Sequence, residues 1–283
     1  MPQIHPTAII DDQATLAEDV VVGPNCIVEG PVTLGPGTKL MAQCYLKGPL
    51  TLGENNTVYP FATIGLEAQD WKADPSHTGP GTVIGDGNVF RESVSIHRAS
   101  KDEHPTTIGN KNYFMACSHV AHDCVIGNDC MFANSALLGG HCEVGDRVIL
   151  GGNCGVQQFC RIGRLSMVGG AEGMTMDLPP FCMIHHTKQV SALNLIGLRR
   201  AGLRPHIAAL REAFNIYYRH GIPGGKALDM IDEKLGQDPC VREFVDFIRE
   251  SKRGVTGYGE SFKHRPWLKP EFYAAQQTAN SGE

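Results

Sequence analysis

The sequence predicts a mainly β protein, a left-handed parallel β-helix followed by a C-terminal α-helical domain, and two observations carry this prediction. First, a large apolar residue stands at every sixth position from Ile4 to Ile64 and from Ile84 to Met174, except at Asp102. This period matches neither a helix nor the alternation of a single strand, so it indicates an architectural repeat. Second, apolar stripes with helical spacing begin only after about Pro205.

Each six-residue unit is interpreted as a short strand and a tight turn. Gly, Asn and Asp, which tolerate positive φ, are common just after the apolar position, as in Ile126-Gly-Asn-Asp129. Three units make one triangular coil, and stacked coils bury the apolar residues in one interior column. An ordinary β-sandwich would need a wider spacing of its strands.

The repeat fills residues 1–190 and is interrupted twice. Polar segments near 65–81 and 97–107 break the period, and we expect both to leave the solenoid as loops. The second loop explains why position 102 is polar. Pro179-Pro180 is expected to end the solenoid, because proline cannot donate to a strand ladder.

A helical domain is predicted over residues 191–254. Three helices are expected in it, the first starting near Pro205, and glycine stop signals follow them at Gly221, Gly236 and Gly254. These helices would cap the open end of the solenoid. Residues 255–283 are polar and aperiodic and form a polar tail, for which the sequence gives no structural prediction.

Composition excludes several classes of protein. The formal net charge is −5 and no Lys or Arg run occurs, so no nucleic-acid partner is expected. No apolar run is long enough to span a membrane, and no signal peptide precedes the repeat. The ten cysteines form no CxxC pair and many lie within the repeats, where small buried residues are needed. We therefore expect reduced thiols in a cytoplasmic protein.

Chemistry is expected at outward positions and in loops, because inward residues are required for packing. Positions 18 apart stack on successive coils, which aligns His122, Gly140 and Gln158 in one column. A free imidazole changes charge near neutral pH, which makes histidine a suitable general base, and His122 is the candidate. The bare amide of Gly140 is the candidate oxyanion donor. His119 and His141 lie close to this column.

On the residues alone, other interpretations stay open. The histidines can be surface groups or polar residues at a subunit contact. A zinc site is a further alternative, as in the zinc carbonic anhydrases built on this type of solenoid. Histidines such as His97, His119, His122 and His141 would supply three nitrogen ligands, some of them from a neighbouring chain. Because His119 and His122 are three residues apart around a corner, we expect them to point in different directions, which favours a site without metal.

Longer motifs make the sequence resemble one family, the UDP-N-acetylglucosamine 3-O-acyltransferases that begin lipid A synthesis. The motifs are Arg91-Glu-Ser-Val-Ser-Ile-His-Arg98, His119-Val-Ala-His-Asp-Cys124, Gly140-His141, Gln158-Phe-Cys160, Asp177-Leu-Pro-Pro180 and Gly197-Leu-Arg-Arg200. The segment Gln69-Asp70-Trp71-Lys72 is similar to the family's Gln-Asp-x-Lys element, which contacts the donor and the sugar.

The resemblance implies transfer of an acyl chain, such as a 3-hydroxyacyl chain, from acyl carrier protein to the 3-hydroxyl of UDP-N-acetylglucosamine. It implies that His122 is the base, that Asp123 orients it, and that no cofactor or metal takes part. It also implies a homotrimer with sites between adjacent solenoids. The residues then expected to bind substrate are Gln69, Asp70, Lys72, His119, His141, Gln158, Gly170, Asn194 and Arg200. Gly170 stands where the family ends its acyl groove, and its lack of a side chain favours a longer chain.

Three residues depart from the family pattern. The family often has histidine at Gln157, glutamate in some members at Ile196, and a second arginine at Ala201. All three are expected on the nucleotide side, so a UDP 2,3-diamino sugar is the alternative acceptor. A zinc carbonic-anhydrase-like enzyme and a non-catalytic hexapeptide scaffold are the remaining alternatives.

Overall fold

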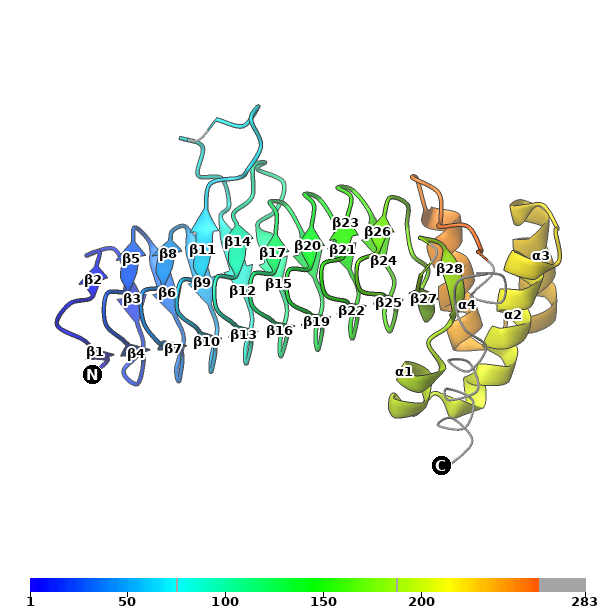
Figure 1. The fold of residues 1–283 in the computed structure, drawn as a ribbon, viewed down its shortest axis with the longest axis horizontal. Helices are drawn as coiled ribbons and strands as arrows, with labels where there is room; N and C mark the ends of the chain where they lie inside the picture. The colour runs from blue at the N-terminus through cyan, green and yellow to red at the C-terminus, as the bar shows by residue number, and fades with distance from the viewer. Residues whose placement is uncertain (75, 187, 260–283) are drawn as a thin grey trace, which may run out of the picture.

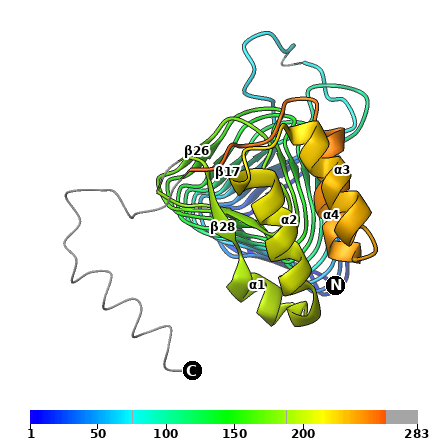
Figure 2. The same ribbon diagram turned by 90° about the vertical axis from the view of Figure 1, so that its right-hand side faces the viewer.

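The computed structural model describes residues 1–259 except Pro75 and Thr187, and these form a long solenoid with helices at one end (Figure 1). Short parallel strands stack in three sheets, here called sheets A, B and C. Viewed along its length the solenoid is triangular, and the helices lie over one end (Figure 2). The predicted fold class, a left-handed parallel β-helix with a C-terminal helical domain, is confirmed.

Each coil contributes one strand to each sheet, and the chain passes from sheet A to sheet B to sheet C. Sheet A contains β1 (Gln3–Ile4), β4 (Val21–Val22), β7 (Lys39–Leu40), β10 (Thr57–Val58), β13 (Val89–Phe90), β16 (Tyr113–Phe114), β19 (Met131–Phe132), β22 (Ile149–Leu150), β25 (Met167–Val168), β27 (Cys182–Ile184) and β28 (Val190–Leu193). Sheet B contains β2 (Ile9–Ile10), β5 (Ile27–Glu29), β8 (Tyr45–Lys47), β11 (Thr63–Leu66), β14 (Ser95–His97), β17 (His119–Val120), β20 (Leu137–Leu138), β23 (Gly155–Val156) and β26 (Gly173–Met174). Sheet C contains β3 (Thr15–Leu16), β6 (Val32–Leu34), β9 (Leu50–Leu52), β12 (Thr82–Ile84), β15 (Thr106–Ile108), β18 (Val125–Ile126), β21 (Glu143–Val144) and β24 (Arg161–Ile162).

Strand pairing places the apolar residues of neighbouring coils next to one another in the core. Phe114 pairs with Phe90 on one side and with Phe132 on the other. Their ring centroids lie 5.1 Å and 4.6 Å apart, and all three side chains are fully buried. Burial of one such ring stabilises the fold by about 2–3 kcal/mol. Ile4, in the first coil, is 44% exposed, because no coil covers it on its outer side.

Both interruptions of the repeat leave the same corner of the solenoid on neighbouring coils (Figure 1). The first lies between β11 and β12, and the second between β14 and β15. Coils on either side of the insertions remain in register, because Val58 pairs with Phe90 and Ile84 pairs with Ile108. The insertions therefore add loops without disturbing the core.

The end of the solenoid differs from the prediction. The chain continues past Pro179-Pro180 into β27, which extends sheet A, and β28 then pairs antiparallel with β27. The prolines do not end the sheet, because they occupy the turn before the strand and no ladder hydrogen bond needs their nitrogen atoms. The predicted domain boundary at residues 190–191 falls inside β28.

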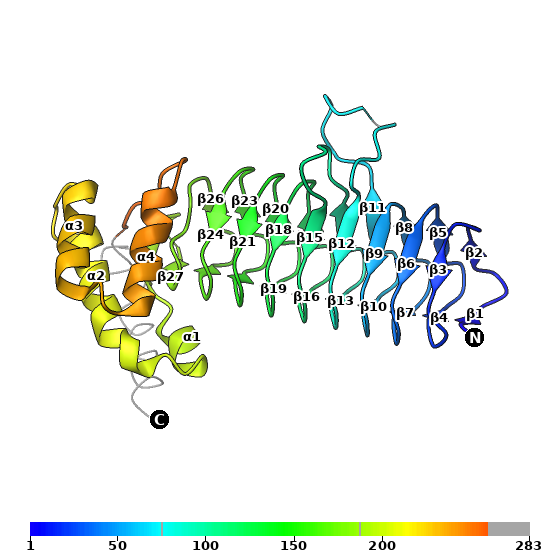
Figure 3. The ribbon, with the colours of Figure 1, turned by 180° about the vertical axis from the view of Figure 1, so that it is seen from behind.

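The helices are α1 (Leu195–Arg200), the 3₁₀ helix η1 (Arg204–His206), α2 (Ile207–Arg219), α3 (Gly224–Leu235) and α4 (Pro239–Glu250). The prediction missed α1, which is too short for an apolar stripe to show. Helix α4 ends four residues before Gly254, its predicted stop. Helix α4 lies beside the last coils of the solenoid (Figure 3). Arg164 pairs with Glu243 of α4 at 2.7 Å, which links the helices to these coils.

The first residues of the predicted tail are part of the folded domain. Val255 bridges Asp177, and Tyr258 bridges Val190. Buried Asp177 also accepts hydrogen bonds from the Arg161 amide and the Ser251 hydroxyl. Residues 260–283 of the tail lie outside the described residues.

All ten cysteines are free. Cys117 was expected to be buried with the others but is exposed, because it occupies the outward turn position with φ of 62°. No helix in the described part of the chain is long and apolar enough to cross a membrane.

Candidate active site

The predicted catalytic column lies at the corner where sheet B strands lead into sheet C strands, here called the B/C corner. His122 lies in the turn between β17 and β18, Gly140 between β20 and β21, and Gln158 between β23 and β24. The two inserted loops leave this same corner on the preceding coils. The loops and the column therefore share one edge of the solenoid.

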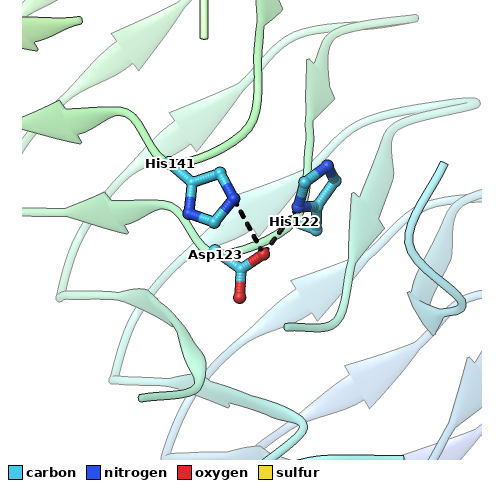
Figure 4. A group of neighbouring side chains, drawn as sticks. All are labelled: His122, Asp123 and His141. Atoms are coloured by element: carbon cyan, nitrogen blue, oxygen red, sulfur yellow. Dashed lines mark hydrogen bonds and ion pairs between the residues drawn. The ribbon is translucent and has the colours of Figure 1, made fainter. Parts of the chain in front are cut away.

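His122 and Asp123 form a buried pair (Figure 4). The His122 Nδ1 atom lies 2.6 Å from Asp123 Oδ2, and His141 Nε2 lies 3.5 Å from the same oxygen. The two imidazole rings meet edge to face, with centroids 5.2 Å apart. One carboxylate thus contacts both histidines.

Asp123 is held from several sides. Its carboxylate accepts hydrogen bonds from the Ser100 hydroxyl at 2.6 Å and from the Ser100 and Lys101 amides, all in the second loop. Its own amide donates to the Thr106 hydroxyl at 2.8 Å. Burial opposes its ionisation, but the hydrogen bonds with His122 and Ser100 outweigh it and lower the pKa of Asp123 to about 2. The carboxylate is therefore ionised, and His122 Nδ1 must be the donor.

Gly140 lies directly beside the His122 ring. A Cβ atom added to Gly140 would lie 2.8 Å from His122 Nε2, too close without a shift of the ring. Its carbonyl accepts from the Phe159 amide, while its N–H donates to no described residue. The His122 ring and the unpaired N–H of Gly140 therefore lie next to each other. Only glycine fits at position 140, because a side chain would collide with the ring.

His141 and Phe159 stack in parallel, with centroids 4.5 Å apart and an interplanar angle of 6°. Burial lowers the pKa of His141, an effect that Asp123 opposes in part. Gln158 is exposed beside this pair. The sequence analysis missed Phe159, although its position 18 residues after His141 is a signal for stacking. It also missed Ser100 and Thr106, because the inserted loop hides their register.

His119 points outward from sheet B and belongs to a second pair of histidines. Its Nδ1 atom lies 2.8 Å from the Ser95 hydroxyl, and its ring meets that of His97 edge to face at 5.2 Å. Burial, and to a lesser degree His97 and His122, lower the pKa of His119 to about 4. His119 is therefore a neutral hydrogen-bonding group at neutral pH.

The first loop is held by contacts with His97 and Arg98, but within one chain its described residues do not reach the column of His122, Gly140 and Gln158. His97 Nδ1 contacts the Glu67 carbonyl, and buried Arg98 donates to the His77 carbonyl at 3.1 Å. Asp70 accepts the amide of Lys72 at 3.0 Å, and Gln69, Trp71 and Lys72 are exposed. No hydrogen bond or ion pair among the described residues joins Gln69, Asp70 or Lys72 to His122.

Asn194 and Arg200 lie far around the triangle from His122. They line a cavity of about 860 Å³ between α1 and the outward side chains of sheet A, such as Ile149 and Met167. Ile196 and Ala201 line the same cavity. The Asn194 amide caps α1 by accepting the Gly197 N–H and donates to the Leu165 carbonyl, so it shapes this groove. Since sheet A lies opposite the B/C corner, one chain does not bring these groups together with His122.

Gly170 lies at the corner between sheets A and B, on the other edge of sheet B from His122. Along the outer face of sheet B, Gly155 and Gly173 leave open space where side chains would stand. A bare strip of backbone thus runs beside Gly170.

Two groups of side chains in the described part of the chain have the spacing of metal ligands. One is His122, Asp123 and His141, and the other is His206, Asp238 and Cys240. Of the histidines considered as zinc ligands from the sequence, His122 and His141 lie in the first group, whereas His97 and His119 belong to neither group.

A solenoid of six-residue repeats with a buried His–Asp pair at one corner defines a class, the hexapeptide-repeat transferases. Residues 105–140 match the model for the bacterial transferase hexapeptide (six repeats). Residues 177–256 match the model for UDP N-acetylglucosamine O-acyltransferase, domain 2.

Relatives narrow the class to one family. The chain is 44% identical over 261 residues to the acyl-[acyl-carrier-protein]–UDP-N-acetylglucosamine O-acyltransferase of Ectopseudomonas mendocina, covering 90% of this chain and 100% of that protein. It is 45% identical to the enzyme of the same name from Halorhodospira halophila, covering 90% and 99%. The chain therefore belongs to the family of acyl-[acyl-carrier-protein]–UDP-N-acetylglucosamine O-acyltransferases and is an enzyme, an acyltransferase.

Solved structures agree. LpxA from Acinetobacter baumannii superimposes with a TM-score of 0.84 at 37% identity, covering 89% of this chain and 99% of that chain. The UDP-N-acetylglucosamine acyltransferase of Francisella novicida gives a TM-score of 0.87 at 29% identity, covering 94% and 100%. The resemblance expected from the motifs is confirmed.

Proposed function

We propose that this protein transfers an acyl chain, such as a 3-hydroxyacyl chain, from acyl carrier protein to the 3-hydroxyl of UDP-N-acetylglucosamine, the first step of lipid A synthesis. One observation carries the proposal. His122 has its Nδ1 atom fixed by an ionised carboxylate and its Nε2 atom beside the bare, unpaired amide of Gly140. A base and an oxyanion donor side by side are the two groups that acyl transfer to a hydroxyl requires.

The mechanism follows from that geometry. His122 Nε2 takes the proton of the sugar hydroxyl as its oxygen attacks the thioester carbonyl carbon. Negative charge develops on the carbonyl oxygen, and the Gly140 N–H stabilises it without reorganisation. The tetrahedral intermediate collapses, the carbon–sulfur bond breaks, and the proton on Nε2 passes to the leaving thiolate. Asp123 fixes the tautomer and favours the imidazolium that forms.

The substrate groups are supplied by two chains. Asn194 and Arg200 line the groove over sheet A, whereas His122 stands at the opposite corner. A homotrimer in which the B/C corner of one solenoid faces sheet A of the next would combine them. It would also bring Gln69, Asp70 and Lys72 of one chain against a neighbour's column. The apolar outward residues of sheets A and B, including exposed Met131 and Leu137, support packing of these faces.

Further binding roles follow the column. His141 and Gln158 stand one and two coils beyond His122, within reach of the same sugar. His119, neutral and outward, is a hydrogen-bonding group for the acceptor. The acyl chain would run along the bare strip of sheet B toward Gly170, and the absence of a side chain there favours a long chain. We place the reaction in the cytoplasm, where acyl carrier protein and sugar nucleotide are available.

The first experiment offers the purified full chain a panel of acyl carrier protein thioesters with UDP-N-acetylglucosamine and, in parallel, the UDP 2,3-diamino sugar. We expect ester formation that persists in chelator. Transfer only to the diamino sugar would overturn the acceptor assignment and point to Ile196 and Ala201. Loss of activity in chelator would favour the zinc alternative, and no transfer at all would favour a scaffold.

A second experiment tests the shared site. His122→Ala and Arg200→Ala are each expected to impair transfer. If the two residues serve one site from different chains, mixed trimers made by co-expression regain activity, since some sites then receive both native residues. A mixture no more active than the two single variants contradicts the two-chain site.

A further inference from the structure

The second group of metal-binding side chains lies in the helical domain, away from the B/C corner. It contains His206, Asp238 and Cys240, and one ligand atom from each lies within 4.8 Å of the other two. His206 ends η1 just before α2, whereas Asp238 and Cys240 stand at the start of α4. The proposed acyl transfer uses none of these residues.

The oxygen and nitrogen ligands are already oriented. Asp238 Oδ1 caps α4 by accepting the amides of Cys240 and Val241 at 2.9 Å and 3.1 Å. Its other oxygen, Oδ2, lies 2.9 Å from His206 Nδ1. The cap fixes the carboxylate so that its second oxygen faces the histidine, an arrangement that a metal ion could occupy in place of the shared proton.

The group is closed on one side and open on the other. Cys240 is 2% exposed. The side chains of His206 and Asp238 are 27% and 19% exposed, so an ion can enter from the solvent side. A sheltered thiol with two accessible hard ligands suits a metal that binds sulfur, nitrogen and oxygen together.

The surrounding charge permits a cation. Arg164 lies 4.0 Å from Cys240 Sγ, but its guanidinium is paired with Glu243, whose two oxygens lie 2.7 Å and 2.8 Å from Arg164 Nε. Glu243 therefore offsets the positive charge. A thiolate and a carboxylate would together supply two negative charges, matching a divalent ion.

We propose that His206, Asp238 and Cys240 bind a zinc ion that ties the start of α2 to the start of α4. Three protein ligands leave a fourth tetrahedral position for water. The ion would lie in the helical domain and take no part in acyl transfer, so the proposal is compatible with a catalytic corner that uses no metal. Metal binding displaces the thiol proton. Because protons compete with the metal for the thiolate, affinity should fall as the pH is lowered.

Cobalt(II), which replaces zinc and reports thiolate ligands by a charge-transfer absorption, is the direct probe. The full chain is stripped with chelator, titrated with cobalt(II), and then with zinc to displace it. We expect a thiolate band that saturates at one ion per chain. Cys240→Ser should abolish the band, and His206→Gln should weaken binding by about tenfold or more. Cys117→Ser, which removes an exposed thiol elsewhere, is the matched control and should change nothing.

The other histidine group contains no cysteine, so it cannot produce the thiolate band. Zinc should also raise the Tm of the native chain and of Cys117→Ser, but not that of His206→Gln. Absence of the band in the native chain, or its persistence in Cys240→Ser, would overturn the proposal. Circular dichroism of both variants establishes that the comparison is made between folded proteins.

Discussion

Two corners of the same solenoid have the same backbone turn and opposite uses. At the corner between sheets C and A, the second turn residue of several successive coils gives its N–H to a side chain of the next coil. The amides of Asp86, Asn110 and Asn128 donate to Asn110, Asn128 and Asp146 at 2.7–2.8 Å. At the B/C corner, the same turn position holds His122, Gly140 and Gln158, and their N–H groups donate to no described residue.

The contrast between paired amides at one corner and unpaired amides at the other shows how a repeat fold can form a binding site. The coil geometry leaves one turn amide without a backbone partner, and a polar backbone group must find a partner in protein or solvent. Asn and Asp at one corner supply that partner and stabilise the stack. At the other corner the amides stay open to a ligand, and the second inserted loop adds groups that hold Asp123. Substitutions at the B/C corner are therefore expected to affect catalysis most, whereas substitutions at the other corner should affect only stability.

His122→Ala should reduce kcat roughly 10²- to 10⁴-fold, the usual contribution of a positioned general base. Steady-state transfer with saturating substrates measures it. His220→Ala, at the exposed end of α2, is the control and should retain full activity. A His122→Ala enzyme with native kcat would remove the B/C corner from catalysis.

Gly140→Ala keeps the backbone N–H but should lower kcat by roughly 10²-fold or more, because a general base contributes about 10²- to 10⁴-fold only when it is correctly positioned. The added methyl group would lie 2.8 Å from His122 Nε2 and displace the base from the amide. Gly225→Ala, in α3 with open space around it, is the control. Unchanged kcat in Gly140→Ala would mean that the close approach of His122 to residue 140 is not needed for catalysis.

Asp123→Asn should alter stability in acid. The pKa of Asp123 is lowered in the folded state, so its stabilisation is present above about pH 4 and is lost as the pH falls toward 2. The contribution is on the order of 2 kcal/mol. Urea unfolding at a series of pH values should show a shallower acid decline in Asp123→Asn than in the native chain. Parallel declines would contradict the assignment.

Asn128→Ala should destabilise the fold by about 1 kcal/mol, because the Asn110 amide loses its acceptor at a partly exposed position. Transfer activity should be unchanged. The midpoint of denaturant unfolding and kcat, measured on the same preparation, test both statements. A loss of kcat without a loss of stability would mean that the corner between sheets C and A also takes part in catalysis.

Most of the solenoid can be predicted from the sequence, because the six-residue apolar pattern is set within each short unit of the chain. Each six-residue unit carries its own inward residue and turn, so Phe90, Phe114 and Phe132 can be aligned by counting alone. Counting also aligns His122 with Gly140, since both lie between the insertions and the end of the repeat. Residues cannot be aligned by counting where the six-residue period is interrupted. The contacts of Ser100 with Asp123 and the continuation past Pro179-Pro180 have no periodic signal.

The fold class, the column of chemical groups at one edge, and the family whose motifs they form can therefore be predicted from the residues alone. The three-dimensional structure was needed to show which nitrogen of His122 is free, which corner amides are unpaired, and that Arg200 lies across the triangle from His122. It also brought His206 next to Cys240. The physical reason is that a repeat fixes positions within and between neighbouring coils, whereas loops, caps and hydrogen-bond partners depend on segments far apart in the chain.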